Sequence, residues 1–253
     1  MLAVHAVGLW KRFDTKVAVA GIDLSVPSGS FCGLVGPNGA GKTTTIRMLV
    51  GLLRPDEGYV TIAGVPVWPD PRAAKAIIGV LPDDLRLFER LSGAELLTYL
   101  GLFRGIDRAE VDRRRGELLD VLGLAADASV LVADYSTGMR KKIALAAALL
   151  HGPRVLFLDE PFESVDPISA RTITDVLTDF RHRGGTVVFS SHVMETVERL
   201  CDHVAIVAAG EVVRTGTLDE VRAGHTLEDA FIEAVGAPIE SAASLDWLGG
   251  RSS

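Results

Sequence analysis

The segment from Gly36 to Thr44 has the residue types and spacing of a phosphate-binding loop. It reads GPNGAGKTT and fits the pattern G-x-x-x-x-G-K-[ST] in full. Its glycines allow a tight turn that aims backbone N–H groups at an anion, and the helix predicted from residue 44 to residue 50 adds partial positive charge. In such a loop Lys42 reaches the β- and γ-phosphates, and the hydroxyl of Thr43 contacts Mg²⁺.

A glycine-rich turn that matches by accident is the alternative, and the apolar run at residues 31–35 and the helical flank argue against it. We therefore predict nucleotide binding through the residues of this loop, which are Gly36, Pro37, Asn38, Gly39, Ala40, Gly41, Lys42, Thr43 and Thr44.

A pair of carboxylates follows a second apolar run. Asp159 and Glu160 come directly after residues 155–158, and the carboxyl end of a buried parallel strand faces the crevice where α/β sheets bind ligands. We predict that Asp159 holds Mg²⁺ and that Glu160 polarises the water that attacks the γ-phosphate. Taken alone the pair could be an ordinary helix N-cap, and the phosphate loop upstream favours the catalytic interpretation.

An imidazole follows a third apolar run. His192 comes after residues 186–190 at the same predicted sheet edge, where it could contact the γ-phosphate. A hydrogen-bonded surface histidine is the alternative interpretation. The predicted catalytic residues are therefore Glu160, His192 and Lys42.

A covered parallel sheet is needed to bring these residues together. The continuous apolar runs and the helix predicted at 171–181 indicate such a sheet. Antiparallel strands are predicted in the first thirty residues and at 58–64, and residues 203–215 predict a hairpin that turns at Ala209-Gly210. The fold class is thus predicted as α/β, a P-loop NTPase core with an antiparallel β subdomain.

The middle of the chain has a different character. Residues 90 to 150 are rich in Leu, Ala, Arg and Glu at helical spacing, and leucines fall on one helical face near position 97 and on another near position 119. We predict a helical subdomain at about 86–151, inserted into the core and β subdomain at 1–85 and 152–225. Together they form one domain at 1–225, and 226–253 is predicted as a short C-terminal helix and a frayed tail.

Composition limits the possible partners. The formal net charge of −7 gives no support to a nucleic-acid partner. The only two cysteines, Cys32 and Cys201, have apolar neighbours and are predicted to be core thiols rather than a disulfide. The N-terminus lacks the pattern of a signal peptide, and the longest apolar run, 143–150, is too short to span a bilayer. We do not expect this chain to cross a membrane.

With a further motif, residues 2 to about 225 resemble the nucleotide-binding subunits of ATP-binding cassette (ABC) transporters. The segment YSTGM at 135–139 stands where the family has its signature Leu-Ser-Gly-Gly-Gln. The resemblance implies that Ser136, Thr137, Gly138 and Met139 grip the γ-phosphate of ATP bound to the opposite subunit. Ser136 is a good N-cap and Gly138 would permit close approach by a phosphate, although a simple capped helix is the alternative.

The resemblance extends to three single positions, each with a structural alternative. Phe13 stands where the family stacks an aromatic ring on adenine, but it could be ordinary strand packing. Asp166 matches the aspartate of the loop that crosses between subunits, but it could also form an Asp-Pro turn. Asp83 replaces the glutamine that binds Mg²⁺ and the attacking water; it can bind Mg²⁺, although it is shorter and cannot donate a hydrogen bond. The predicted metal ligands are thus Thr43, Asp83 and Asp159.

The altered signature indicates a branch of the family. Thr137 and Met139 replace a glycine and a glutamine, and Tyr-Ser-x-Gly-Met followed by basic residues resembles the branch whose partners are ABC-2-type permeases, typical of drug, antibiotic or polysaccharide export. We predict that the basic run 140–142 is a solvated helix face rather than a nucleic-acid or lipid patch. Phe88 lies in the region that receives the permease's coupling helix in the family.

The resemblance implies an ATP- and Mg²⁺-dependent ATPase subunit that powers a separate transmembrane permease. It would pair with a second ABC ATPase subunit, as a homodimer or a heterodimer, at the cytoplasmic face of the cell membrane. It would be peripheral there and touch the membrane through the permease only. The alternatives are an ABC ATPase that acts on ribosomes or DNA and a regulatory cassette, as in cell division, that moves no cargo. A single cassette, an insertion of ordinary size and the acidic charge favour transport.

Overall fold

The larger of two β-sheets is a mostly parallel one. The computed structural model describes residues 1–236, and this sheet has the strand order β10-β9-β3-β8-β7-β6. The five parallel strands are β9 (His203–Ala208), β3 (Phe31–Val35), β8 (Thr186–Ser191), β7 (Val155–Leu158) and β6 (Ile78–Leu81), and β10 (Glu211–Thr217) pairs antiparallel at one edge. Every residue of β3, β7 and β8 is buried, as strands covered on both faces require. The α/β fold class is confirmed.

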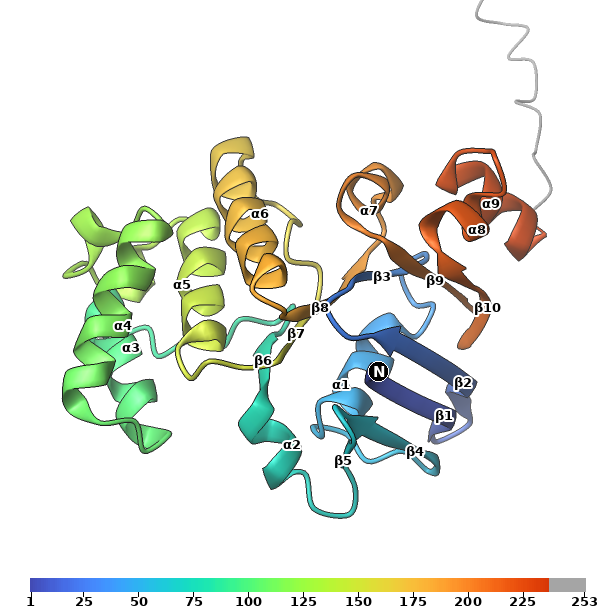
Figure 1. Ribbon diagram of the computed structural model, residues 1–253, viewed down its shortest axis with the longest axis horizontal. Coiled ribbons are helices and arrows are strands. Elements are labelled where there is room, and N and C mark those ends of the chain that lie inside the picture. Colours follow the sequence, from blue (N-terminus) through green and yellow to red (C-terminus); the bar gives the residue numbers. More distant parts are fainter. Residues whose placement is uncertain (237–253) are drawn as a thin grey trace, which may run out of the picture.

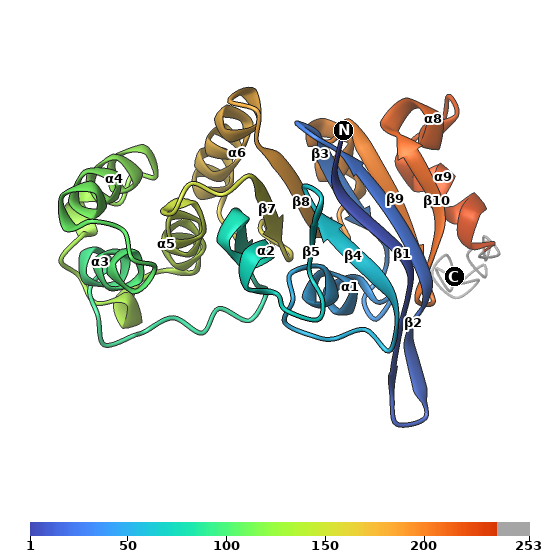
Figure 2. The ribbon, with the colours of Figure 1, turned by 60° about the horizontal axis from the view of Figure 1, so that its bottom comes forward.

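The second sheet is antiparallel and contains the N-terminus. Its order is β2 (Lys16–Pro27), β1 (Leu2–Phe13), β4 (Glu57–Ile62) and β5 (Val65–Pro66). β1 and β2 are long strands broken by several register shifts, which is why their sequence shows only short apolar runs. The tip of their hairpin extends beyond the rest of the fold (Figure 2).

Helices cover both faces of the larger sheet. α1 (Lys42–Leu49) lies between it and the second sheet, while α6 (Pro167–His182) and α7 (Met194–Leu200) pack on the opposite face (Figure 1). Each face of the sheet has its own apolar cluster. Successive side chains of a strand point to opposite faces, so Phe31 of β3 belongs to one cluster and its neighbour Cys32 to the other. Cys32 and Cys201 are buried free thiols, as predicted, and burial raises the pKa of Cys32 to about 12.

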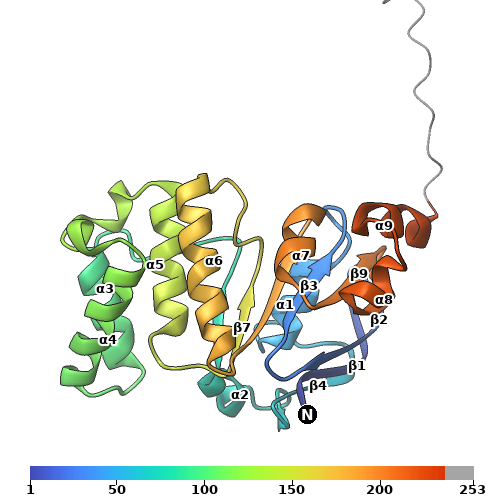
Figure 3. The same ribbon diagram turned by 45° about the horizontal axis from the view of Figure 1, so that its top comes forward.

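The helical region lies at one end of the molecule. It contains α3 (Gly93–Phe103), α4 (Arg108–Val121), two 3₁₀ turns at Ala125–Asp127 and Val132–Asp134, and α5 (Thr137–Leu149). α5 lies beside α6, and α3 and α4 lie outside it (Figure 3). The leucines near positions 97 and 119 are buried in the same core cluster as those of α5, which confirms the predicted faces.

Other segments differ from the sequence-based expectation. α6 begins at Pro167 rather than at 171, because Asp166 caps it and proline suits the first helical turn. α2 (Arg72–Ile77), which precedes β6, was not expected, and no side chain caps it. α8 (Leu218–Arg222) and α9 (Leu227–Val235) follow β10, so α9 lies in the predicted C-terminal segment 226–253.

The tail predicted beyond residue 236 lies outside the described residues, and the domain limits remain predictions. Within residues 1–236, no helix combines the length and apolar character that a bilayer crossing requires.

Candidate nucleotide-binding site

The predicted site residues follow strands that end at one edge of the larger sheet. Leu158 of β7 pairs with Leu81 of β6 on one side and with Phe189 of β8 on the other. β3 continues this alignment, since Val35 pairs with Ser191. The phosphate loop, Asp83, the Asp159-Glu160 pair and His192 therefore all leave the sheet at the same edge. The sequence predicted this for all of them except Asp83.

The phosphate loop turns directly into α1. Gly41 has φ 106° and caps the helix, which begins at Lys42 rather than at Thr44. A Cβ at Gly41 would lie 2.6 Å from the carbonyl oxygen of Ala18, so both the backbone conformation and the close approach of β2 require glycine. The N–H of Ala40 donates to the Pro37 carbonyl at 3.2 Å and closes the turn.

Lys42 is folded back over the loop. Its side chain is buried, with 6% exposure, and its Nζ donates to the carbonyls of Gly36 at 2.7 Å and Pro37 at 3.2 Å. The same Nζ lies 3.6 Å from Oε1 of Glu160. The ammonium is thus placed between the loop and the carboxylate that follows β7.

A chain of hydroxyl and carboxylate oxygens lies under the loop. Thr43 Oγ1 donates to Asp159 Oδ1 at 3.2 Å, and Ser190 Oγ donates to the same oxygen at 2.6 Å. Ser190 Oγ in turn accepts from the N–H of Glu160 at 2.9 Å. Ser190 was not predicted as a site residue, because its role depends on β8 lying next to β7.

This donor set fits Mg²⁺, which prefers hard oxygen ligands. Across residues 1–236, no group of three or more His, Cys, Asp or Glu side chains could hold a metal ion by itself. The arrangement therefore suits a cation that takes most of its ligands from phosphate and water, with Thr43 and Asp159 nearby.

Glu160 has an unusual backbone and a free carboxylate oxygen. Its φ is +46°, in the left-handed region. Oε2 lies 3.1 Å from Nδ1 of His192, whereas Oε1 is buried and receives no hydrogen bond from the residues that the structure describes. His192 thus contacts Glu160, and its contact with the γ-phosphate stays a prediction. Oε1 remains available to accept a hydrogen bond from water.

A hollow of about 440 Å³ opens above these residues. The residues that line it are Phe13, Lys16, Ala18, Asn38, Gly39, Gly41, Lys42, Thr43, Thr44, Asp83, Glu160 and Glu163. Phe13 is 46% exposed, and the Nζ of Lys11 lies over its ring at 5.8 Å from the centroid. Gly36, Pro37 and Ala40 are outside this lining, and Asp159 is buried beneath it.

Sequence reasoning missed Lys16, Ala18 and Glu163. Phe13 pairs with Lys16 at the tip of the hairpin of β1 and β2. A hairpin predicted at this point would have placed Lys16 and Ala18 beside Phe13.

The signature residues lie away from this hollow, on the N-terminal turn of α5. Ser136 Oγ accepts from the N–H of Met139 at 3.2 Å, which confirms the predicted N-cap. Gly138 is buried, and a Cβ there would lie 2.6 Å from both Asp166 Oδ2 and Ser169 Oγ. The predicted reason for this glycine was phosphate approach; the structure shows that the contact between α5 and α6 already requires it.

Asp166 caps α6. Its Oδ1 accepts from the N–H groups of Ser169 at 2.9 Å and Ile168 at 3.1 Å, and the Ser169 N–H holds the pKa of Asp166 below its usual range. Asp166 thus forms the turn that the alternative interpretation gave it. Its role at a subunit interface stays a prediction.

The basic run after the signature is not a uniform solvated face. Lys141 is buried, and its Nζ donates to the carbonyl oxygen of Glu160 at 2.9 Å. Arg140 donates to the Val132 carbonyl and to Glu89. The prediction was wrong for Lys141, because α5 is covered by the sheet and α6 at that position.

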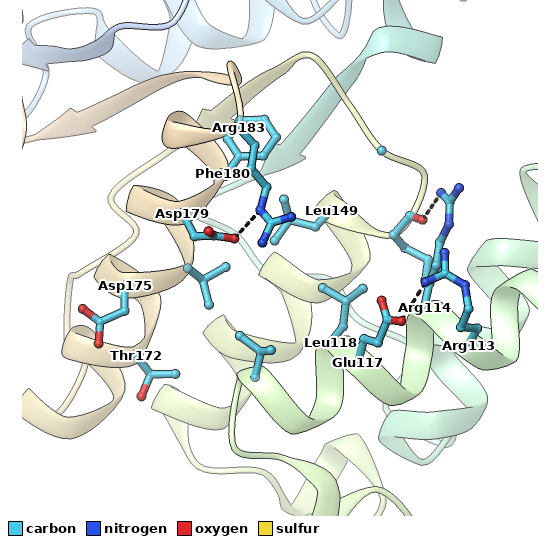
Figure 4. A pocket seen from close by; sticks show the side chains of 14 residues that line it. Arg113, Arg114, Glu117, Leu118, Leu149, Thr172, Asp175, Asp179, Phe180 and Arg183 are labelled. Carbon is cyan, nitrogen blue, oxygen red and sulfur yellow. Dashed lines mark hydrogen bonds and ion pairs between the residues drawn. The ribbon is translucent and has the colours of Figure 1, made fainter.

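A larger hollow of about 810 Å³ lies between α4, α5 and α6 (Figure 4). Its arginines are bonded to neighbouring carboxylates or to the backbone: Arg113 to Glu117, Arg183 to Asp179, and Arg114 to the Leu150 carbonyl. A phosphate would have to displace these partners. The hollow at the phosphate loop is therefore the candidate nucleotide site.

Known proteins share this arrangement. The family model described as ABC transporter matches residues 19–163. The chain belongs to the ABC transporter family. Its fold and its membership make it an ABC ATPase, as the resemblance implied.

Three relatives of this ABC ATPase illustrate the match. The linearmycin resistance ATP-binding protein LnrL of Bacillus subtilis (strain 168) is 37% identical over 214 residues, which are 85% of this chain and 69% of LnrL. The daunorubicin/doxorubicin resistance ATP-binding protein DrrA of Streptomyces peucetius is 37% identical over 220 residues, 87% of this chain and 67% of DrrA. The Nod factor export ATP-binding protein I of Rhizobium sp. (strain N33) is 35% identical over 216 residues, 85% of this chain and 71% of the relative.

Solved structures agree. An ATP-binding subunit of an ABC transporter is 29% identical, with a TM-score of 0.85 over 92% of this chain and 99% of its own. A dimeric ATP-binding cassette in a post-hydrolysis state with ADP and Pi is 23% identical, with a TM-score of 0.79 over 85% of this chain and 98% of its own, and shows the fold alone.

Proposed function

We propose that this ABC ATPase hydrolyses ATP at the phosphate-loop hollow and powers export through a separate ABC-2-type membrane permease. The observation that carries the catalytic part is Glu160, whose buried Oε1 accepts no hydrogen bond from the described residues and lies 3.6 Å from the Lys42 ammonium, while Oε2 is held by His192. The curated relatives named for drug resistance and for Nod factor export support the export part.

ATP binds with its phosphates in the loop and its base against Phe13. Lys42 exchanges its bonds to the Gly36 and Pro37 carbonyls for the β- and γ-phosphates, and the N-terminus of α1 adds partial positive charge. Thr43, Asp83 and Asp159 would hold Mg²⁺, which would neutralise part of the phosphate charge.

Glu160 then acts on the attacking water. Its Oε1 accepts the hydrogen bond of that water and orients the oxygen toward the γ-phosphorus. His192 keeps the carboxylate in place through Oε2, because its Nδ1 lies 3.1 Å away.

The site is proposed to be completed by a second ABC ATPase subunit. Ser136, Thr137, Gly138 and Met139 lie outside the hollow of their own chain, so in a dimer they would close over the hollow of the partner, and Asp166 would lie at the same interface. Two ATP molecules would thus be enclosed between two subunits.

Three aromatic side chains offer a surface to the permease. Phe88, Tyr99 and Phe103 form a ring group with centroid distances of 5.3 Å and 6.2 Å, and each is exposed, Phe103 by 78%. An exposed apolar group of this kind fits a protein partner. We propose that this aromatic surface receives the permease, which would place the chain at the cytoplasmic face of the membrane.

The decisive experiment replaces Glu160 by glutamine. Loss of the carboxylate should lower the steady-state ATPase rate by about 100-fold or more while ATP still binds, so the variant should accumulate as an ATP-bound dimer. Size-exclusion chromatography with light scattering measures the dimer, and Glu195→Gln, at an exposed residue of α7, is the matched control. Undiminished turnover in Glu160→Gln would contradict the assignment of Glu160.

A further inference from the structure

Lys141 is a buried lysine next to the proposed active site. It lies one turn into α5, its residue exposure is 5%, and its Nζ donates to the carbonyl oxygen of Glu160 at 2.9 Å. Lysines rarely occupy such positions, because burial of an ammonium is unfavourable unless it is paired and hydrogen-bonded. Nothing in the mechanism described so far uses this group.

The topology explains what Lys141 faces. α5 packs on β6, and β6 pairs with β7 so that Leu81 lies opposite Leu158. The N–H of Asp159 also donates to the Leu81 carbonyl at 2.8 Å, so the two strand ends leave the sheet together. Lys141 therefore lies over the point where Asp83 follows one strand and Glu160 follows the other.

Four carboxylates lie close enough to act on the charge of Lys141. Burial lowers the pKa of Lys141, and the negative charges of Asp83, Glu163, Asp159 and Glu160 oppose that shift. Lys42, the other buried lysine here, bonds the phosphate loop and would be engaged by the phosphates of ATP. Lys141, on α5, then remains to offset the negative charge of these carboxylates.

The contact between Lys141 and the Glu160 carbonyl matters because the backbone of Glu160 is strained. A residue with a side chain is disfavoured at φ +46°, so neighbouring groups must hold it there. Its N–H is held by Ser190 Oγ, and its carbonyl accepts from Lys141 Nζ at 2.9 Å and, at the longer distance of 3.3 Å, from the N–H of Glu163. One of these side chains belongs to the sheet and the other to the signature helix.

We propose that Lys141 is a positioning residue for ATP hydrolysis, which holds the Glu160 peptide so that Oε1 points at the attacking water. It does not touch the substrate. It links the helix that begins with the signature residues to the carboxylate of the same subunit. This inference rests on the proposed function, because it requires Glu160 to act on the water.

The test compares four variants of the full-length chain: Lys141→Met, which keeps the volume and removes the charge; Lys141→Arg, which keeps the charge; Lys142→Met, the adjacent control; and Lys141→Met combined with Glu160→Gln. Steady-state kinetics give kcat and KM for ATP. We expect Lys141→Met to lower kcat by about tenfold or more with KM changed by less than about threefold, as for loss of an interaction that acts on the chemical step.

Lys141→Arg should recover part of kcat, and Lys142→Met should retain wild-type kinetics. The double variant should still form the ATP-bound dimer, which shows that Lys141→Met folds and binds nucleotide. Normal kcat in Lys141→Met, or a loss expressed in KM alone, would overturn the inference. Failure of the double variant to fold or dimerise would also overturn it, because Lys141 would then serve the fold.

The two proposals fail separately. If the Glu160→Gln variant keeps its ATPase activity, the proposed function is wrong, whatever the result for Lys141. If Glu160→Gln is inactive and Lys141→Met is fully active, only the role proposed for Lys141 is wrong.

Discussion

At the scale of single residues, the left-handed backbone of Glu160 depends on its neighbours. Such a conformation costs about 1–2 kcal/mol for a residue with a side chain. Ser190 serves two partners at once, since its Oγ donates to Asp159 Oδ1 and accepts from the Glu160 N–H. The same hydroxyl thus fixes the proposed Mg²⁺ ligand and the proposed base.

Ser190→Ala should therefore be costly in two ways. It leaves the buried Asp159 carboxylate without its shortest hydrogen bond, so the free energy of unfolding should fall by about 1–3 kcal/mol in urea titrations. ATPase activity should also fall, because the Glu160 N–H loses its acceptor. Ser191→Ala is the control, since the Ser191 hydroxyl bonds only the local Val193 backbone. Equal stability of the two variants would contradict this account.

At the scale of elements, α5 and α6 approach closely at Gly138. The position that a Cβ would take is already filled by Asp166 and Ser169 at the start of α6. The two helix N-termini are therefore fixed to each other at their first turns.

Gly138→Ala should separate these helix ends. We expect a loss of about 1–3 kcal/mol in the free energy of unfolding, because the added methyl group forces a backbone shift. Gly116→Ala in α4 is a sharp control: a Cβ there meets nothing within 4 Å, and alanine should stabilise the helix by about 0.5–1 kcal/mol. Opposite signs for the two variants are the expected result, and a stabilising Gly138→Ala would rule out the close approach.

The sequence predicts the elements that depend on local pattern. Continuous apolar runs identify β3, β7 and β8, and the N-cap preference of Ser136 identifies the start of α5. The edge strand β6 has four residues and follows an uncapped helix, so it carries too little local signal.

The site residues likewise divide into those that the sequence pattern predicts and those that only the packing reveals. The phosphate loop and the Asp159-Glu160 pair are visible because their residues are adjacent in the chain. Lys141 is not visible, since a lysine inside the run 140–142 looks like an exposed face until the packing of α5 is known. Its partner is a backbone carbonyl 19 residues away, which no side-chain pattern marks.

At the scale of the whole molecule, the nucleotide hollow and the aromatic surface lie in different parts of the fold. The hollow is lined by the sheets and the phosphate loop, whereas Tyr99 and Phe103 belong to α3 of the helical region and Phe88 lies just before it. A permease docked on the aromatic surface is therefore linked to the hollow by α5 and its neighbours and by the segment between Asp83, which lines the hollow, and Phe88.

Phe103→Asp should weaken that docking. A charge in the middle of an apolar contact is expected to lower the fraction of chain that co-purifies with its permease by about tenfold or more. Val121→Asp, at an exposed apolar residue of α4, is the control and should leave co-purification intact. Equal recovery of both variants would move the permease contact elsewhere on the surface.

The packing of Gly138 against Asp166 and Ser169 also has a thermodynamic consequence for a dimer. In the proposed dimer, a γ-phosphate held by the signature residues of one subunit bears on the loop that leads back from Asp166 to that subunit's own Glu160. Binding at one ATP site then changes the affinity at the other, and linkage requires the effect to be equal in both directions. The Hill coefficient for ATP binding should therefore differ from one, because the helix that contacts one nucleotide is packed against the element that leads to the carboxylate acting on the other.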